Sequence, residues 1–318
     1  MKSIITICFL FITVCLWSQG KRDYPVDTSF SIYGSWVKEK KKFPQITIAE
    51  PAITPAIKVE ENIVYRSLGD RQLLLDIYRP AKTKKKSPVV LMIFGGGWRS
   101  GDKTHNRAMA IKLAEQGYVA VSAEYRLSLE ASFPAAVHDL KAAVQWLKQH
   151  AKQYHIDINK IATLGCSAGG QLASLIGNTN GNPFFEDSTA KQRYNSDVHA
   201  VVNIDGTLAF KHPESVEGPV AAQWLGGTWE QSPETWTNAA PLTHINPKSP
   251  PFLFVNSSIP RFHAGRDDMI KKMDIWGIYH ETKTFPDTPH TFWFFNPWFN
   301  EMMDTIVSYL DKVFKLKK

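Results

Sequence analysis

The pentapeptide GCSAG at residues 165–169 directly follows a short apolar run at 161–164, and this order strongly constrains the local fold. It predicts a buried strand that turns sharply into a helix, with the serine in a strained backbone conformation at the turn. Glycines on both sides of the serine allow such a turn, because a Cβ atom would clash there. The first N–H groups of the helix would then face a position where negative charge can develop. Ser167 is therefore a candidate nucleophile; the alternative is a glycine-rich turn with an incidental serine.

Strands and helices are predicted to alternate through most of the chain. The continuous apolar run at 88–94 is typical of a strand buried on both faces. Alternation on this scale implies an α/β fold with one mostly parallel central sheet and helices on both faces. Residues 206–248, rich in Pro, Gly and Trp, are expected to be an irregular, cap-like excursion over the active site. The other predicted strands are 63–65, 73–78, 118–123, 161–164, 198–204, 252–255 and 279–285, and the predicted helices are 103–116, 135–150, 267–276 and 298–315.

The N-terminus has the pattern of a targeting segment. Lys2 supplies a positive start, residues 4–16 are apolar, and Ser18 is a small residue at a plausible cleavage point. We therefore expect a signal peptide at 1–18 and export to the periplasm or the medium; an uncleaved membrane anchor is the alternative. A lipoprotein would need Cys15 as lipid acceptor, but the bulky Val14 precedes it. An N-terminal arm at 19–60 and a catalytic domain at 61–318 would follow.

Composition excludes several other classes of protein. A chain of 318 residues with 43% hydrophobic content is long enough for one large globular domain. Two of its three cysteines lie in the targeting segment, so the mature chain would keep only Cys166 and form no intramolecular disulfide. No cysteine and histidine spacing typical of a metal site occurs. The formal net charge of +7 comes without a nucleic-acid-binding motif, so we expect no nucleic-acid partner and no stable membrane insertion after signal cleavage.

A second glycine motif follows the buried strand at 88–94. Here the sequence FGGGW, residues 94–98, resembles the oxyanion loop of the α/β-hydrolase superfamily, in the esterase and lipase group with an HGGGW motif. Phe94 stands where that group usually has histidine. The resemblance extends over about residues 60–316, and it includes EYRL at 124–127 and FPAAVHD at 133–139, which look structural. It implies an α/β-hydrolase fold, with the N–H groups of Gly95, Gly96 and Ala168 as oxyanion donors.

The resemblance also implies where a base and an acid should lie. The base should follow the last strand, and His290 is the one of ten histidines in that place. The acid usually follows the preceding strand, but the sequence after 252–255 is NSSIPR and holds no carboxylate. Asp205 ends the strand before that, in a place where some lipases carry the acid, although Asp-Gly is also a common turn. Asp267 and Asp268 are the alternatives; both could simply cap a helix.

The loop at 260–266 is expected at the carboxyl edge of the sheet, where ligands bind in open α/β sheets. Arg261, His263 and Arg266 are candidates for binding a substrate with carboxylate groups, because arginine suits bidentate carboxylate recognition. Local salt bridges are the alternative. Trp98 is a candidate for stacking on a sugar, as are several other tryptophans that could equally be core: Trp224, Trp229, Trp236, Trp293 and Trp298.

The expected activity is that of a serine carboxylic-ester hydrolase that needs no cofactor. Similarity to exported bacterial carbohydrate esterases implies a polysaccharide or oligosaccharide partner, with acetyl or methyl esters of pectin or xylan type as substrates. A general short-chain esterase or a feruloyl esterase is the main alternative. Two other classes are less favoured. A peptidase of this fold usually carries a propeller domain, for which this chain has no room. A non-catalytic binding protein would not need both Ser167 and His290.

Overall fold

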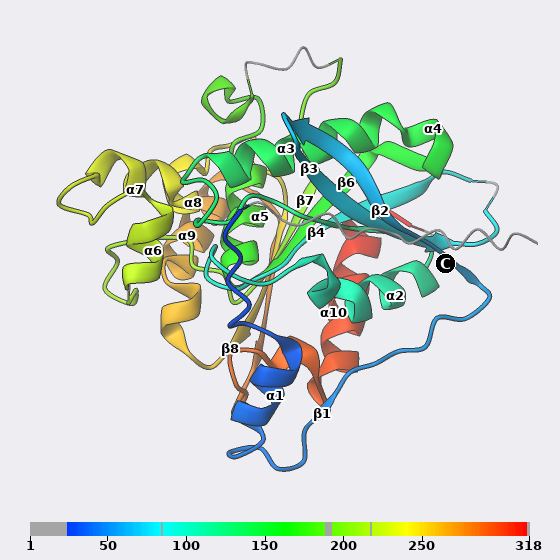
Figure 1. Ribbon diagram of the computed structural model, residues 1–318, viewed down its shortest axis with the longest axis horizontal. Coiled ribbons are helices and arrows are strands. Elements are labelled where there is room, and N and C mark those ends of the chain that lie inside the picture. Colours follow the sequence, from blue (N-terminus) through cyan, green and yellow to red (C-terminus); the bar gives the residue numbers. More distant parts are fainter. Residues whose placement is uncertain (1–23, 84, 188–192, 217, 317–318) are drawn as a thin grey trace, which may run out of the picture.

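The computed structural model describes residues 24–83, 85–187, 193–216 and 218–316 (Figure 1). The expected signal peptide at 1–18 and Cys15 lie outside these residues. Within the described ranges, no helix has the length and apolarity that crossing a membrane requires.

An eight-stranded sheet forms the centre of the molecule, in the order β2-β3-β5-β4-β6-β7-β8-β9. The β2–β3 and β3–β5 pairs are antiparallel, and all other neighbours are parallel. This confirms the predicted fold class. The strands are β2 (Ile57–Leu68), β3 (Arg71–Pro80), β4 (Ser87–Ile93), β5 (Val119–Ala123), β6 (Ile156–Cys166), β7 (Ala200–Ile204), β8 (Phe252–Ser257) and β9 (His280–Phe285).

The two faces of the sheet bury separate cores. Along β4, Val89 and Leu91 pack in one core with α3 and α5, whereas Val90 and Met92 pack in the other with α2 and α10. This follows from the two-residue period of a strand. Figure 1 shows the sheet running between these two helix layers. The helices are α2 (Arg107–Glu115), α3 (Ala135–Gln149), α4 (Ala151–Tyr154), α5 (Ala168–Asn178), α9 (Arg266–Trp276) and α10 (Trp298–Val313).

The segment at 206–248 differs from its prediction as an irregular stretch. It contains three short helices, α6 (Pro219–Trp224), α7 (Pro233–Ala239) and α8 (Pro241–His244). These helices are too short to show a clear hydrophobic period. Each has proline at its first position, where the missing N–H would have no partner in the helix anyway. That proline signal was available in the sequence.

The predicted N-terminal arm is also more structured than its sequence suggests. It contains α1 (Ile32–Glu39) and β1 (Thr47–Ile48), and β1 pairs with β10 (Phe295–Asn296) just before α10. Strand β2 begins at Ile57, inside the predicted arm. The short 3₁₀ helices are η1 (Lys103–Asn106), η2 (Pro183–Phe185), η3 (Pro260–His263) and η4 (Phe292–Phe294).

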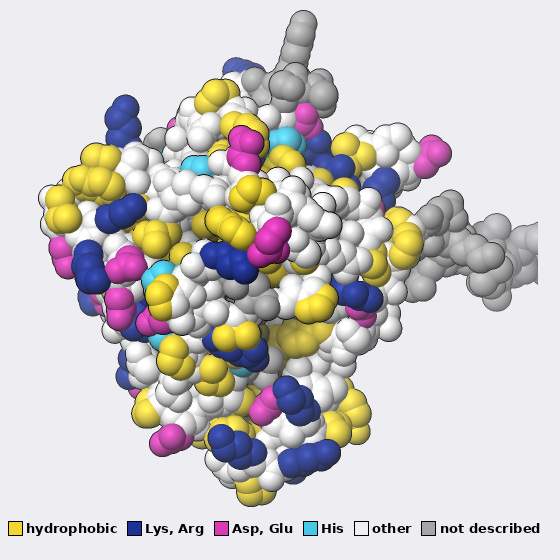
Figure 2. All heavy atoms as spheres, turned by 90° about the vertical axis from the view of Figure 1, so that its left-hand side faces the viewer, with side chains coloured by type: hydrophobic (Ala, Val, Ile, Leu, Met, Phe, Trp, Pro, Cys, Tyr) yellow, Lys and Arg dark blue, Asp and Glu magenta, His cyan; other side chains and the backbone are white. Residues whose placement is uncertain are grey.

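The surface carries charges of both signs. Figure 2 shows basic and acidic side chains interspersed with hydrophobic ones on the face seen there. The net positive charge of the chain is therefore distributed on this face and is not gathered into a single basic field.

Candidate active site

Ser167 lies at the turn between β6 and α5, with φ 54° and ψ −122°. The glycines beside it are required by close backbone contacts. A Cβ atom on Gly165 would lie 2.0 Å from the carbonyl oxygen of Gly169, and one on Gly169 would lie 2.1 Å from that of Ile93. The Ser167 N–H donates to the Ile204 carbonyl oxygen at 2.8 Å, which ties the turn to β7. The strained turn thus presents the serine hydroxyl at the carboxyl edge of the sheet.

His290 lies between β9 and η4 and contacts the serine. Its Nε2 is 2.9 Å from Ser167 Oγ. The ring of Phe262 stacks on the imidazole with 3.3 Å between centroids and 9° between planes, and Trp293 meets it edge-on at 5.0 Å. Stacking on one face and an aromatic edge contact fix the plane of the imidazole.

Asp205 completes the hydrogen-bonded chain. Its Oδ2 lies 3.0 Å from His290 Nδ1, and its Oδ1 accepts a hydrogen bond from the Ser257 N–H at 2.8 Å. The residue follows β7 directly with φ 48°, and its side chain is fully buried. The Asn203 side chain accepts from the Gly206 N–H at 2.7 Å and donates to its carbonyl oxygen at 3.0 Å. Asn203 thereby holds the turn that points Asp205 toward His290.

The two alternative acids lie in the first turn of α9 with other partners. Asp268 pairs with His212 at 3.1 Å and with Lys271 at 2.9 Å. Asp267 accepts a hydrogen bond from the Arg266 guanidinium at 2.7 Å. The structure therefore brings Asp205 to His290, and it leaves both α9 carboxylates engaged elsewhere.

Burial determines the protonation of the groups around Ser167. It lowers the pKa of His290; the hydrogen bond and negative charge of Asp205 oppose this, whereas the positive charge of Arg261 adds to it. A neutral imidazole can accept the serine proton at neutral pH. Burial raises the pKa of the Cys166 thiol well above its ordinary value, with the charge of Asp205 adding to the effect. Cys166 is thus a protonated packing residue beneath the turn, and its chemistry differs from that of a reactive thiolate.

The glycine motif packs directly against the serine turn. A Cβ atom on Gly95 would lie 2.7 Å from the Cys166 carbonyl oxygen and 3.1 Å from Ser167 Cβ. Gly96 has φ 125°, and its carbonyl oxygen accepts N–H groups of the following turn, those of Arg99 at 3.2 Å and Ser100 at 3.0 Å. The loop therefore curls so that its first glycines lie beside Ser167, next to Ala168 at the start of α5.

Phe94, which departs from the usual histidine, is held by the EYRL stretch. It stacks on Tyr125 with 4.5 Å between ring centroids, and the Tyr125 hydroxyl donates to the Phe94 carbonyl oxygen at 2.9 Å. Arg126 in turn pairs with the buried Asp139 of the FPAAVHD stretch at 2.8 Å. The two stretches that looked structural thus support the strand end that carries the glycine loop.

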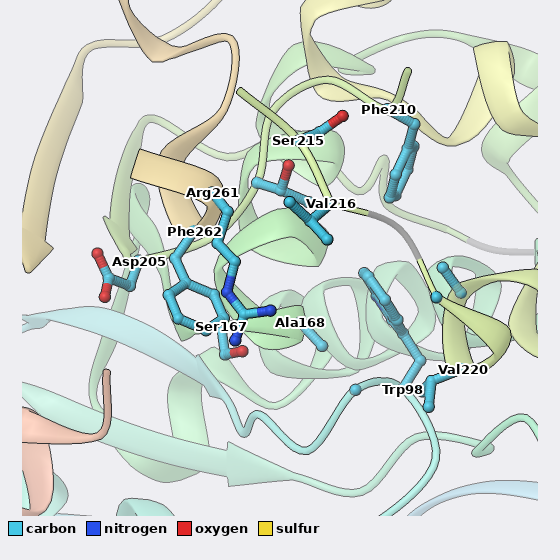
Figure 3. Close-up of a pocket in the computed structure, with 14 residues that line it drawn as sticks. Trp98, Ser167, Ala168, Asp205, Phe210, Ser215, Val216, Val220, Arg261 and Phe262 are labelled. Atoms are coloured by element: carbon cyan, nitrogen blue, oxygen red, sulfur yellow. The ribbon is translucent and has the colours of Figure 1, made fainter. Parts of the chain in front are cut away.

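Ser167 opens onto two pockets, both of which are also lined by Gly97, Val220 and Phe262. The first, of about 380 Å³, is mainly apolar (Figure 3). The second, of about 490 Å³, is also mainly apolar but includes the polar side chains of Asp27, Arg99 and His290. The first pocket is further lined by Trp98, Ala168, Asp205, Thr207, Phe210, Ser215, Val216, Gly218, Ala221 and Arg261, and the second by Asp27, Ser29, Phe30, Gly96, Arg99, Ser100 and His290.

The four residues predicted to bind substrate divide into two pairs. Trp98 and Arg261 line the first pocket, and in Figure 3 the Arg261 side chain extends into it in front of Ser167. Among the described residues, the lining of both pockets at Ser167 lacks His263 and Arg266. His263 is buried, and Arg266 bonds the side chains of Asn256 and Asp267. The structure thus leaves both residues outside the pocket lining, with Arg266 engaged by local partners and His263 buried beneath the loop at 260–266.

Most of the predicted stacking tryptophans belong to the core. Trp224, Trp236 and Trp293 are almost fully buried, and Trp224 stacks on Trp98 at 4.7 Å. Trp98 itself is held by its indole N–H, which donates to Gln171 at 2.8 Å. The pocket residues Phe210, Val216 and Phe262 gave no sequence signal, because single aromatic and aliphatic residues in a loop have no periodic pattern.

Comparison with known proteins links this chain to esterases. The model of the BD-FAE family matches residues 75–263. Esterase LipC of Mycobacterium tuberculosis is 30% identical over 59% of this chain and 48% of its own length. The probable carboxylic ester hydrolase LipM of the same organism is 31% identical over 64% of this chain and 46% of its own length. The chain thus spans about half the length of these curated relatives.

Solved structures share the fold. A bifunctional GH43-CE protein of Bacteroides eggerthii superposes with a TM-score of 0.69 at 24% identity, covering 80% of this chain and 38% of that protein. Native Est2, a thermophilic esterase of Thermogutta terrifontis, gives a TM-score of 0.66 at 25% identity and covers 81% of this chain and 93% of its own. A truncated carbohydrate esterase from gut microbiota gives 0.64 at 23% identity, over 80% and 96%. These likenesses confirm the α/β-hydrolase fold.

Proposed function

The chain belongs to the BD-FAE family, and on that basis we propose that it is a serine carboxylic-ester hydrolase. The hydrogen-bonded chain from Ser167 through His290 to Asp205 is the observation that carries this proposal. A serine hydroxyl, an imidazole and a buried carboxylate in this order form the constellation that activates a serine for acyl transfer.

In the proposed reaction, His290 Nε2 removes the proton of Ser167 Oγ as this oxygen attacks the ester carbonyl carbon. Asp205 holds the Nδ1 proton and stabilises the imidazolium that forms. The tetrahedral intermediate collapses when its bond to the leaving oxygen breaks and His290 gives that oxygen the proton. Water, deprotonated by the same imidazole, then attacks the acyl-serine. The bond from the acyl carbon to Ser167 Oγ breaks, this oxygen takes the proton back from His290, and the acid is released.

The negative oxygen of the intermediate needs donors that are already in place. We assign this role to the N–H groups of Gly95, Gly96 and Ala168. The tight packing of Gly95 on Ser167 and the start of α5 at Ala168 support the assignment. Loss of one such donor typically lowers kcat by about 10²–10³.

We further propose that the substrate is a polysaccharide or oligosaccharide ester. One structural neighbour is named as a carbohydrate esterase and another as a bifunctional GH43-CE protein, and the mature protein would be exported if residues 1–18 act as a signal peptide. Acetylated xylan and methyl-esterified pectin represent the two candidate ester types. Arg261 supports methyl-esterified pectin, because a guanidinium binds the carboxylates of a uronic-acid polymer. Its side chain lines the first pocket and stacks on Phe262, and it has no carboxylate partner among the described residues.

A feruloyl esterase is the second candidate function. The first pocket has an apolar wall of Trp98, Phe210, Val216 and Val220, and its volume of about 380 Å³ exceeds what an acetyl group occupies. An aromatic acyl group would fill that space and stack on its rings.

Parallel assays of acetate, methanol and ferulate release test these alternatives. The wild-type protein, the Ser167→Ala variant and a Cys166→Ala control are compared on acetylated xylan, methyl-esterified pectin and feruloylated oligosaccharide. We expect turnover that disappears in Ser167→Ala and persists in Cys166→Ala. Turnover that survives loss of Ser167 would overturn the serine mechanism, and the preferred substrate decides the ester type.

A further inference from the structure

We propose that Asp27, Ser29 and Phe30 of the N-terminal segment, together with Arg99, form the binding site for the leaving alcohol, and that this alcohol bears further hydroxyl groups. The inference rests on the proposed ester hydrolysis, taken for an acyl ester of a sugar hydroxyl and not for a methyl ester, whose leaving alcohol is methanol. It assigns the acyl and alcohol halves of that ester to the two pockets. Asp27 and Arg99, which no sequence motif marked, become determinants of specificity.

The position of His290 decides which pocket receives which half of the ester. His290 lines only the second of the two pockets at Ser167. When the tetrahedral intermediate collapses, the proton on His290 Nε2 must reach the leaving oxygen, so that oxygen must lie within hydrogen-bond distance of Nε2. The alcohol therefore leaves through the second pocket. The acyl group stays on Ser167 Oγ and occupies the first, apolar pocket.

The second pocket is built with polar groups suited to a sugar. The Asp27 carboxylate lies 2.6 Å from Arg99 Nε, and another nitrogen of the same guanidinium donates to Gln223 of α6 at 3.0 Å. The side chains remain 16% and 41% exposed, so both can still reach a ligand. A carboxylate accepts from sugar hydroxyls and a guanidinium donates to them, and both are stronger partners than neutral groups.

The segment is fixed in place beside the glycine loop. A backbone bridge joins Asp27 to Ser100, and the ring of Phe30 packs in edge-on contact with His105 and close to Gly96. Asp27 also accepts a hydrogen bond from the Ser29 N–H at 2.8 Å. The wall of the pocket is thus preorganised by contacts with the hydrolase domain, which lowers the entropic cost of binding the alcohol.

The test compares two acetyl esters that differ only in their alcohol. Acetylated xylo-oligosaccharide has a leaving group rich in hydroxyls, whereas 4-nitrophenyl acetate has an apolar one. For Asp27→Asn and Arg99→Gln we expect the ratio of kcat/KM for the sugar ester over the nitrophenyl ester to fall about tenfold, mainly through KM of the sugar ester. The matched control is Thr28→Ala, an exposed neighbour outside the pocket lining, which should keep the wild-type ratio.

The possible outcomes separate the claims. A ratio that stays constant while both activities fall together would mean that Asp27 and Arg99 only brace the glycine loop, and it would overturn the inference. A constant ratio with both activities intact would overturn it as well. Wild-type protein that hydrolyses neither ester would instead refute the proposed function. Thermal unfolding of each variant, measured alongside, shows that a changed ratio belongs to folded protein.

Discussion

Asp205 lies 3.0 Å from His290 although it comes from β7, while the strand nearer to His290 in the chain, β8, ends in Asn256 and Ser257 without a carboxylate. The two strands are neighbours in the sheet, so a side chain at the end of β7 can cross to the edge of β8. The Ser257 N–H then holds the other carboxylate oxygen at 2.8 Å. The acid is thus displaced by one strand, and the backbone that follows β8 still supports it.

Replacing the acid should separate Asp205 from the α9 carboxylates. Asp205→Asn is expected to lower kcat by up to about 10⁴, because an amide favours the wrong imidazole tautomer and cannot stabilise the imidazolium. Asp268→Asn, which removes only the pairs with His212 and Lys271, should keep near wild-type turnover. Steady-state kinetics on a soluble acetyl ester measure both. Similar losses in the two variants would contradict the assignment.

The acid limb of the pH profile should report His290. Protonated imidazole cannot accept the serine proton, so kcat/KM is lost as pH falls through the pKa of His290. Burial lowers that pKa from its ordinary value of 6.5, and we expect half-maximal kcat/KM below pH 6.5. Arg261→Met removes a positive charge that disfavours the imidazolium, so the limb should move to higher pH.

The shift of the acid limb in Arg261→Met should be small, and it should become smaller at high salt, because Arg261 is exposed to solvent. The control is Arg107→Met on α2, a basic residue that is not among the groups that shift the pKa of His290. A limb that moves to lower pH in Arg261→Met would contradict the electrostatic account.

The glycine loop should tolerate no side chain at Gly95. Gly95→Ala places a Cβ atom 2.7 Å from the Cys166 carbonyl oxygen, so the loop must move away from Ser167. We expect kcat to fall by about 10²–10³ while KM changes little, because the loss is confined to the transition state. In Gly117→Ala, the new methyl group meets open space beyond α2, and kcat of the folded protein should persist. A wild-type kcat in Gly95→Ala would show that this loop does not stabilise the oxyanion.

The buried carboxylate of Asp139 should matter for stability. It accepts hydrogen bonds from the guanidinium groups of Arg66 at 2.8 Å and Arg126 at 2.8 and 2.9 Å. Asp139→Asn removes the buried negative charge that both cations share, although Arg66 keeps its ion pair with Asp187, and should lower the free energy of unfolding by about 3 kcal/mol. Glu115→Gln, which removes the exposed pair with Lys112, should cost less than about 0.5 kcal/mol. Urea unfolding measures both, and equal small changes would contradict the prediction.

Local signals in the sequence predicted the framework and two of the site residues. The glycine spacing around Ser167 reflects backbone contacts within a few residues, and the position of His290 follows from chain order after the last strand. Strands such as β4 and β5 were predictable because continuous apolar runs in an alternating pattern have few other solutions. These features depend on short stretches of chain.

Other parts of the site depend on contacts between distant segments. Asp205 and Asp268 both occur in sequences typical of a turn or a helix start, and only the crossing from β7 to β8 distinguishes them. Asp27 reaches Arg99 across 72 residues of chain, and Phe262 covers His290 from a loop with no periodic pattern. Such contacts arise from tertiary packing, which the conformational propensities of single residues do not reveal.

The central claim is that Ser167 becomes acylated, and trapping it tests this most directly. Intact protein is treated with a fluorophosphonate, which reacts with activated serine hydroxyls, and the adduct is located by mass spectrometry of the digested protein. We expect one adduct per chain, on the peptide that contains Ser167, lost in Ser167→Ala and strongly slowed in His290→Ala. Labelling that persists in Ser167→Ala, or a wild-type protein that hydrolyses esters without being labelled at Ser167, would contradict the account.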